Sequence, residues 1–307
     1  MVRLVIDTDP GVDDAHAILF ALAYPGARVE ALTTVSGNVP VDRTTANACK
    51  VLDAAGCGVP VYRGCSRAIA ARHGHAEHVH GEDGLGDCGL PPSSRAVSGE
   101  HAVNALVRLG NENPGELTLV AIGPLTNIAL ATLLDPELPG KYRNLVLMGG
   151  AIHGRGNTTP SAEFNMHSDH EAAAVVFDSW SRFDLVSWET TVAHALYEKQ
   201  LEEILALDTP RAEFFRRITG KTLQFIERAW GRRILLEADF LAVAAAVEPG
   251  VILKAERHAV AVERCGELTR GQTIVDWKDV TGRAPNANLV LEMDRTRLWE
   301  LFKGALR

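Results

Sequence analysis

The chain has 307 residues, of which 46% are hydrophobic and 23% are charged, and its formal net charge is −8. This balance argues against intrinsic disorder and against the basic surface that nucleic-acid binding requires. No stretch of about 18 uncharged apolar residues is present to predict a membrane span, so neither a nucleic acid nor a membrane is an expected partner.

Short apolar runs alternate with longer helical patterns through the first 190 residues. Strands are expected at residues 3–7, 29–36, 59–64, 116–123, 144–150 and 183–189, and helices at 12–22, 41–55, 124–134 and 169–177. Nearly continuous apolar strands that alternate with helices are typical of parallel sheets. The sequence therefore predicts an α/β fold with a mostly parallel sheet flanked by helices on both faces.

The rest of the chain extends this pattern. Residues 197–247 are helical in pattern, strands are expected at 257–264, 271–277 and 287–293, and a final helix starts near Arg295. Residues 64–98 have little periodicity, and so long a loop in a compact domain is usually a lid or disordered. We expect one domain over residues 1–307 with a few additional C-terminal strands.

Five cysteines are scattered along the chain, an odd number without a CxxC pair. This usage fits reduced thiols. The chain begins with the strand-like "VRLVID", without the features of a secretory signal. A cytoplasmic location is the resulting expectation.

The stretch "IDTDPGVDDA" places Asp7, Asp9, Asp13 and Asp14 directly after an apolar run. Two carboxylates about 4 Å apart repel by roughly 4 kcal/mol at a semi-buried effective dielectric, so this cluster needs compensation. Helix capping by Asp9 and a favourable helix dipole for Asp13 and Asp14 would explain part of it. A hard divalent cation explains all of it, because such ions are bound by several oxygen ligands.

Other polar residues also follow predicted strands. Ser36–Asn38 follow the second strand, Gly123–Asn127 follow a later one, and Asn157, Glu163 and Asn165 follow the strand at 144–150. In α/β sheets ligands bind beyond the carboxyl ends of the strands, so the sequence predicts a single site there. Amide and carboxylate groups suit a polyhydroxylated ligand such as a sugar.

A carboxylate also interrupts the strongly apolar segment "ILLEADFLAVAAAVEP" at Asp239. A buried acid must be paired, coordinated or neutral. Together with the N-terminal cluster, Asp239 is best explained as a further metal ligand.

The motifs "DTDPGVDDA", "TTVSGN", "HGEDGLG", "AIGPLTNIALA", "LVLMGGA", "AEFN" and "ADFLAVAAAVEP" occur in this order. They resemble the inosine-uridine preferring nucleoside hydrolases, from about Leu4 to the final helix. The resemblance implies a Rossmann-like nucleoside hydrolase fold and Ca²⁺-dependent hydrolysis of the N-glycosidic bond of ribonucleosides. It also implies association as a homodimer or homotetramer.

The resemblance further implies roles for individual residues. The metal ligands would be Asp9, Asp14, the Thr126 backbone carbonyl and Asp239, with Asp9 also acting as general base. The ribose would be contacted by Asp13, Asn38, Met148, Asn157, Glu163 and Asn165. These roles suit the chemistry, because acids and amide oxygens around the sugar stabilise an oxocarbenium-like transition state.

One position departs from the family pattern. Many members carry a histidine directly before the last metal-binding aspartate, where this chain has Ala238. A methyl group cannot protonate a leaving base, so we favour His80 as the acid over His73, His75 and His78. Phe225 and Trp230 could stack on a nucleobase, but aromatics at helical spacing are more often core residues.

Two other functions remain open at this point. Because Ala238 replaces the family histidine, the chain could be a weakly active or non-catalytic protein that binds nucleosides or ribose. An Asp-x-Asp after the first strand is also found in Mg²⁺-dependent phosphatases, although four neighbouring acids would repel a phosphate.

Overall fold

The computed structural model describes residues 1–70 and 74–307. Its centre is an eight-stranded sheet in the order β3-β2-β1-β4-β5-β6-β12-β9. The strands are β1 (Val2–Thr8), β2 (Ala27–Thr34), β3 (Val61–Arg63), β4 (Leu117–Ala121), β5 (Asn144–Met148), β6 (Phe183–Val186), β9 (Ile252–His258) and β12 (Ala287–Met293). All neighbours are parallel except β12 and β9, which confirms the predicted mostly parallel sheet.

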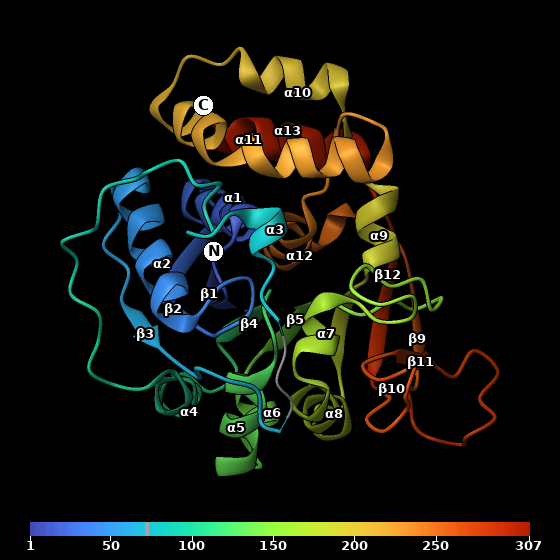
Figure 1. Cartoon of the computed structure of the whole chain (residues 1–307). Coiled ribbons are helices and arrows are strands. Elements are labelled where there is room, and N and C mark those ends of the chain that lie inside the picture. The colour runs from blue at the N-terminus through green and yellow to red at the C-terminus, as the bar shows by residue number, and fades with distance from the viewer. Residues whose placement is uncertain (71–73) are drawn as a thin grey trace.

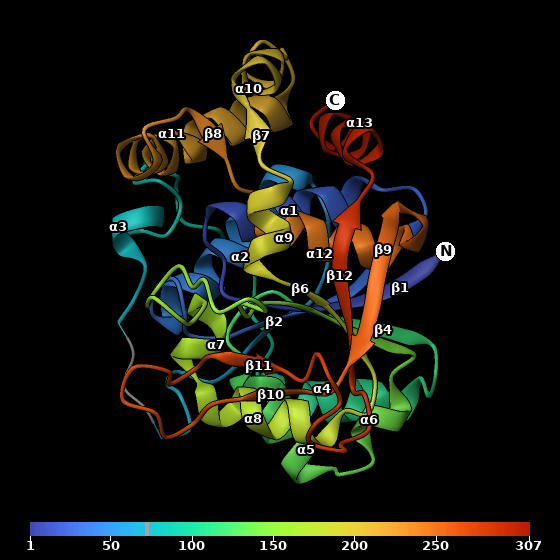
Figure 2. The same ribbon diagram turned by 90° about the vertical axis from the view of Figure 1, so that its right-hand side faces the viewer.

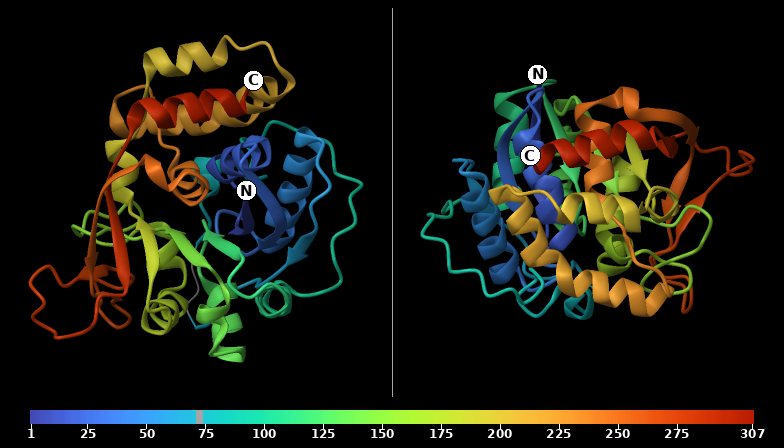
Figure 3. Two further views of the ribbon diagram at one scale, coloured as in Figure 1. Left: turned by 180° about the vertical axis from the view of Figure 1, so that it is seen from behind. Right: turned by 90° about the horizontal axis from the view of Figure 1, so that it is seen from above.

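Helices cover both faces of this sheet (Figures 1 and 2). One face carries α1 (Val12–Ala23), α2 (Val41–Ala55) and α12 (Ala238–Val247), and the other carries α4 (Ala102–Glu112), α5 (Thr126–Leu134), α6 (Leu138–Lys141) and α8 (His170–Ser179). A further layer lies outside α1 and α12 and contains α10 (Glu198–Leu205), α11 (Pro210–Trp230) and α13 (Arg295–Ala305) (Figure 3). None of the helices in the described residues is long and apolar enough to span a bilayer.

Shorter elements complete the chain. They are α3 (Glu77–His80), α7 (Phe164–Ser168), α9 (Trp188–Ala193), the 3-10 turn Pro249–Val251, and the strand pairs β7 (Leu196–Tyr197) with β8 (Ile234–Leu235) and β10 (Val260–Val262) with β11 (Thr273–Val275). Helix α4 is not among the elements that the sequence pattern predicts. In the long loop at 64–98, α3 is the helix that the described residues form.

The C-terminal strands differ from the prediction in one respect. The expected strand at 257–264 corresponds mainly to β10, which begins at Val260 and pairs with β11. It overlaps β9 only at residues 257–258, because β9 begins at Ile252, earlier than the pattern predicts, and ends at His258. The Asn286 side chain explains the break: its Oδ1 accepts from the Val260 N–H at 2.8 Å, and its Nδ2 donates to the Val260 carbonyl at 2.9 Å. Val260 therefore has its backbone partners outside the large sheet.

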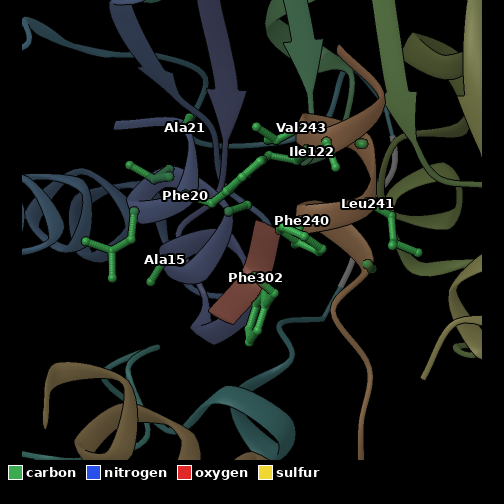
Figure 4. Close-up of a cluster of buried hydrophobic side chains, with 14 of the residues drawn as sticks. Ala15, Phe20, Ala21, Ile122, Phe240, Leu241, Val243 and Phe302 are labelled. Carbon is green, nitrogen blue, oxygen red and sulfur yellow. The ribbon is translucent and has the colours of Figure 1, made fainter. Parts of the chain in front are cut away.

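Aromatic packing fixes α12 between the sheet and the outer layer. Phe240 contacts Phe20 of α1 and Phe302 of α13 in edge-to-face geometry, with ring centroids 4.8 and 4.9 Å apart (Figure 4). All ten residues of α12 are buried. Apolar packing against α1 and α13 therefore holds the helix that carries Asp239 in place.

The strand order reverses between β1 and β4. From β1 the chain continues to β2 and β3 on one side, whereas β4, β5 and β6 lie on the other side. The loops after β1 and β4 consequently diverge, and ligands of α/β sheets bind at such a point. Asp9 follows β1 and Thr126 follows β4.

We predict that Phe302→Ala lowers the free energy of unfolding by about 3–5 kcal/mol, because it leaves a cavity beside the rings of His16, Phe215 and Phe240. Urea unfolding followed by circular dichroism measures the loss. The matched control is Leu134→Ala at a side chain that is 62% exposed, where we expect a change below about 0.5 kcal/mol. Equal effects at the two positions would contradict this account of the core.

Candidate functional site

The Asp9 carboxylate is enclosed by three loops that meet beyond the sheet. Its Oδ2 accepts from the Asn38 backbone N–H at 2.7 Å. A Cβ on Gly37 would lie 2.0 Å from Asp9 Oδ2, and one on Gly123 would lie 2.5 Å from Oδ1. Only glycine fits at these two positions while Asp9 stays in place.

Asp14 anchors the first turn of α1. Its Oδ1 accepts from the Thr8 hydroxyl at 2.5 Å, and its Oδ2 accepts from the Gly11 N–H and from Asn38 Nδ2, both at 3.0 Å. Asp14, rather than Asp9, therefore supplies the cap of this helix. The capping alternative for Asp9 is wrong, since Asp9 accepts from the loop that follows β2.

The N-terminal acids meet Asp239 although more than 200 residues separate them in sequence. One carboxylate oxygen each of Asp13, Asp14 and Asp239 lies within 4.8 Å of the others, an arrangement that could hold a metal ion. Among the described residues, Asp9 Oδ1 and Asp13 Oδ1 are buried without a hydrogen-bond partner. The cluster includes Asp13, which we expected at the ribose, and it does not include Asp9.

Burial and mutual repulsion disfavour the ionised form of these acids. Burial, followed by the charge of Asp14, raises the pKa of Asp9 well above its usual value, and burial, followed by the charge of Asp13, raises that of Asp239. Burial also raises the pKa of Asp13 to about 7 and that of Asp14 to about 6. A divalent cation reverses this preference, because it stabilises carboxylates at close range. The donor set and the unpartnered oxygens fit such an ion.

Thr126 begins α5 and is buried three residues after Gly123. Its hydroxyl donates to Asp169 Oδ2 at 2.6 Å. The side chain is thus engaged away from the acids, so only its backbone remains for the metal role that the resemblance implies.

A cavity of about 770 Å³ lies beside the acid cluster. Eight of the predicted site residues line it: Asp13, Asn38, His80, Met148, Asn157, Glu163, Asn165 and Asp239. Asp9, Asp14 and Thr126 are buried and are not among the residues that line it. The structure therefore brings the predicted sugar-contacting residues into one cavity.

Backbone contacts fix the wall that follows β5. Glu163 caps α7, and its two oxygens accept from the N–H groups of Asn165, Met166 and Gly150 at 2.9–3.2 Å. Asn165 Nδ2 donates to the carbonyls of Ile122 and Met148 at 3.2 and 3.3 Å. Asn157 Oδ1 accepts from the Phe164 N–H at 2.9 Å. These bonds hold the amides and Met148 in position before any ligand binds.

The opposite wall is largely apolar. Phe225 and Trp230 of α11 line the cavity. Phe225 also packs against the hydrophobic core, as helical spacing suggested, whereas Trp230 is 42% exposed and is not a core residue. Trp188 and Ala238 also contribute. Such a surface suits the flat face of a nucleobase.

His80 lies at the junction of the two walls. Its Nδ1 accepts from the Val12 N–H at 3.1 Å, which leaves the hydrogen of the neutral ring on Nε2. Burial lowers the pKa of His80 to about 4, so the ring is uncharged at neutral pH. His78 also lines the cavity, His75 Nδ1 contacts the Gly37 carbonyl at 2.8 Å, and His73 lies outside the described residues.

The long loop docks on α11 beside the cavity. Thr222 Oγ1 donates to the Val79 carbonyl at 3.1 Å, and Arg217 donates to the Cys88 carbonyl at 3.2 Å. Lys221 forms an ion pair with Asp87. Within this loop His78, Val79 and His80 line the cavity, so the start of the docked segment forms part of the site.

Sequence reasoning missed a buried pair in this region. His16 of α1 contacts Glu237, the residue before Ala238, and Glu237 lines the cavity. A charge adjacent to Ala238 in an apolar stretch was the available signal for Glu237. His16 carried none, since its partner is 221 residues away.

Comparisons with known proteins agree with this geometry. The family model described as inosine-uridine preferring nucleoside hydrolase matches residues 4–300. An inosine-uridine preferring nucleoside hydrolase of Leishmania major is 34% identical, with 99% of this chain and 97% of that protein covered. A pyrimidine-specific ribonucleoside hydrolase of Salmonella arizonae is also 34% identical, with 99% and 98% covered.

A solved structure supports the same assignment. A plant nucleoside hydrolase superimposes with a TM-score of 0.94 at 33% identity, covering 99% of this chain and 98% of the plant chain. The match extends over the sheet, the helices and the loops that build the site. The chain therefore belongs to the inosine-uridine preferring nucleoside hydrolase family.

Proposed function

We propose that this chain hydrolyses the N-glycosidic bond of ribonucleosides with Asp9 as general base and with Ca²⁺ held by the acid cluster. As a member of its family the chain is an enzyme, a ribonucleoside hydrolase. The observation that carries the proposal is the unpartnered Asp9 Oδ1, buried among acids beside a cavity lined with amides. The products are ribose and the free nucleobase.

The metal ligands in this proposal are Asp9, Asp14, Asp239 and the Thr126 carbonyl. Bound Ca²⁺ supplies positive charge that binds the ribose 2′- and 3′-hydroxyls and makes water more acidic. The residues fit this ion, because oxygen ligands in irregular number are its usual environment. Asp13 belongs to the group of neighbouring acids and lines the cavity, which supports its proposed contact with the ribose.

Asp9 Oδ1 accepts the proton of the attacking water in this scheme. Its Oδ2 is fixed by Asn38, so the carboxylate cannot rotate away from that water. Bond cleavage leaves positive charge on the ribose, which the acids and the oxygens of Asn157 and Asn165 stabilise. Met148 packs beneath the sugar.

His80 acts on the leaving base in this proposal. Its Nε2–H offers a hydrogen bond to a base nitrogen as negative charge develops there. Ala238 lines the cavity without a polar group, so it contributes only shape.

We predict that Gly123→Ala abolishes hydrolysis, because its Cβ would collide with Asp9 Oδ1. The activity should fall by about 100-fold or more if the base moves by 1 Å. Steady-state kinetics on inosine and thermal unfolding measure the two effects. Gly58→Ala is the control, since nothing lies within 4 Å of its Cβ, and it should leave both unchanged. A fully active Gly123→Ala variant would exclude Asp9 as the base.

The central experiment compares p-nitrophenyl riboside with inosine, uridine, cytidine and adenosine, with and without a chelator. Nitrophenolate leaves without protonation, so its release tests water activation separately from leaving-group help. We expect rapid cleavage of this riboside that a chelator abolishes and Ca²⁺ restores. Cleavage that survives complete removal of metal would overturn the metal role.

We predict that His80→Ala slows cleavage of natural nucleosides about 100-fold or more while changing p-nitrophenyl riboside cleavage less than about threefold. The ratio of kcat values for the two substrate types is the measurement. Equal losses on both would exclude His80 as the group that assists the leaving base.

The same assays address the two other functions. Binding of ribose and Ca²⁺ without hydrolysis of any nucleoside or riboside would favour the non-catalytic alternative. Phosphate release from p-nitrophenyl phosphate, which we do not expect, would favour a phosphatase.

We also propose a cytoplasmic homo-oligomer, a dimer or tetramer. All five cysteines are free, as in proteins of reducing compartments. Leu268 and Val280 are each 81% exposed near the C-terminal strands and offer apolar surface for association.

A further inference from the structure

His16 and Glu237 form a buried pair next to the acid cluster. His16 Nδ1 lies 2.9 and 3.1 Å from the two carboxylate oxygens of Glu237. The residues are only 2% and 4% exposed. The other ring nitrogen, Nε2, lies 3.2 Å from Thr219 Oγ1, whose hydrogen goes to the Phe215 carbonyl at 2.6 Å. Both nitrogens of His16 are therefore engaged, and the ring cannot turn freely.

The pair connects the two segments that supply the acids. His16 lies on α1 two residues after Asp14, and Glu237 is the residue that precedes α12, two residues before Asp239. A residue at this position usually caps its own helix with its side chain. Glu237 makes no such bond and reaches across to α1 instead. Its side chain thus joins the start of α12 to the second turn of α1.

We propose that His16 and Glu237 form a positioning pair that sets the distance between Asp14 and Asp239 and thereby the affinity for the cation. This inference rests on the proposed metal site. Ca²⁺ binds oxygens at about 2.3–2.6 Å, so a small shift of one helix end would remove a ligand. Residues that orient metal ligands typically change metal affinity about 10–100-fold when they are replaced.

The charge of the pair is a competing explanation. After burial, the charge of Glu237 is the main influence that raises the pKa of Asp13, whereas His16 lowers it, so both groups act on the acids. If charge alone mattered, loss of Glu237 would weaken cation binding and loss of His16 would not. A positioning role requires that both losses weaken it.

Two conservative variants of Glu237 separate the effect of side-chain length from the effect of charge. Glu237→Asp keeps the carboxylate and shortens it by one methylene, whereas Glu237→Gln keeps the length and an acceptor for His16 without the charge. Titration calorimetry of metal-free protein with Ca²⁺ alone measures the affinity. We expect Glu237→Asp to weaken binding about tenfold or more and Glu237→Gln to stay within about threefold.

His16→Ala and the double variant His16→Ala/Glu237→Ala complete a cycle. His16→Ala should also weaken Ca²⁺ binding about tenfold, and the double variant should be little worse than either alanine variant alone, because one interaction is lost in each case. Thr132→Val is the control on the other face of the sheet. It removes the acceptor of a buried bond from Trp180 Nε1 at 3.1 Å, so it destabilises the fold without changing Ca²⁺ affinity.

The proposal is overturned if Glu237→Gln weakens binding and Glu237→Asp does not, or if His16→Ala binds Ca²⁺ as tightly as the unchanged protein. These two glutamate variants and thermal unfolding decide the question even if the alanine variants fail to fold. Absence of Ca²⁺ binding in the unchanged protein would instead overturn the metal site itself. The two failures are therefore distinguishable.

Discussion

The structure depends on burying several aspartates close together beyond β1 and β4, the strands between which the strand order reverses. Asp13, Asp14 and Asp239 meet there with Asp9 nearby, and burial and mutual repulsion disfavour their ionised forms. The rest of the architecture serves this placement. The apolar packing of α12 carries the last acid to the others, and the loop glycines leave room for the first.

Much of the fold was predictable, because most buried strands are apolar runs and most of the helices that cover the sheet show a helical repeat of apolar residues. The division between β9 and β10 was not predictable, since it depends on the amide of Asn286, about 26 residues away in sequence. Helix α4 lies just after the long aperiodic loop, where the pattern gave no clear start. The periodicity of a segment predicts its helix or strand. It does not show which side chain from a distant part of the sequence will end that element.

The candidate site was predictable where a residue type conflicted with its surroundings. Acids at the end of an apolar strand, and Asp239 within an apolar helix, indicated the cluster from sequence. The family resemblance added the residues expected to contact the ribose, and all of these line the cavity. The contact between His16 and Glu237 was not predicted, because the two residues are distant in sequence and meet only when α1 packs against α12. Only the folded structure shows that Asp13 lies with Asp14 and Asp239.

The two walls of the cavity differ in how they are built. The wall after β5 is tied to backbone groups of the central sheet, so few changes are tolerated there. The wall from α11 belongs to the outer layer, and Trp230 is 42% exposed to solvent. An exposed lining side chain such as Trp230 can therefore be exchanged without disturbing the sheet or the acids, unlike Thr219 of the same helix, which contacts His16. In the proposed scheme, a change at such a position would alter base preference and leave the ribose contacts in place.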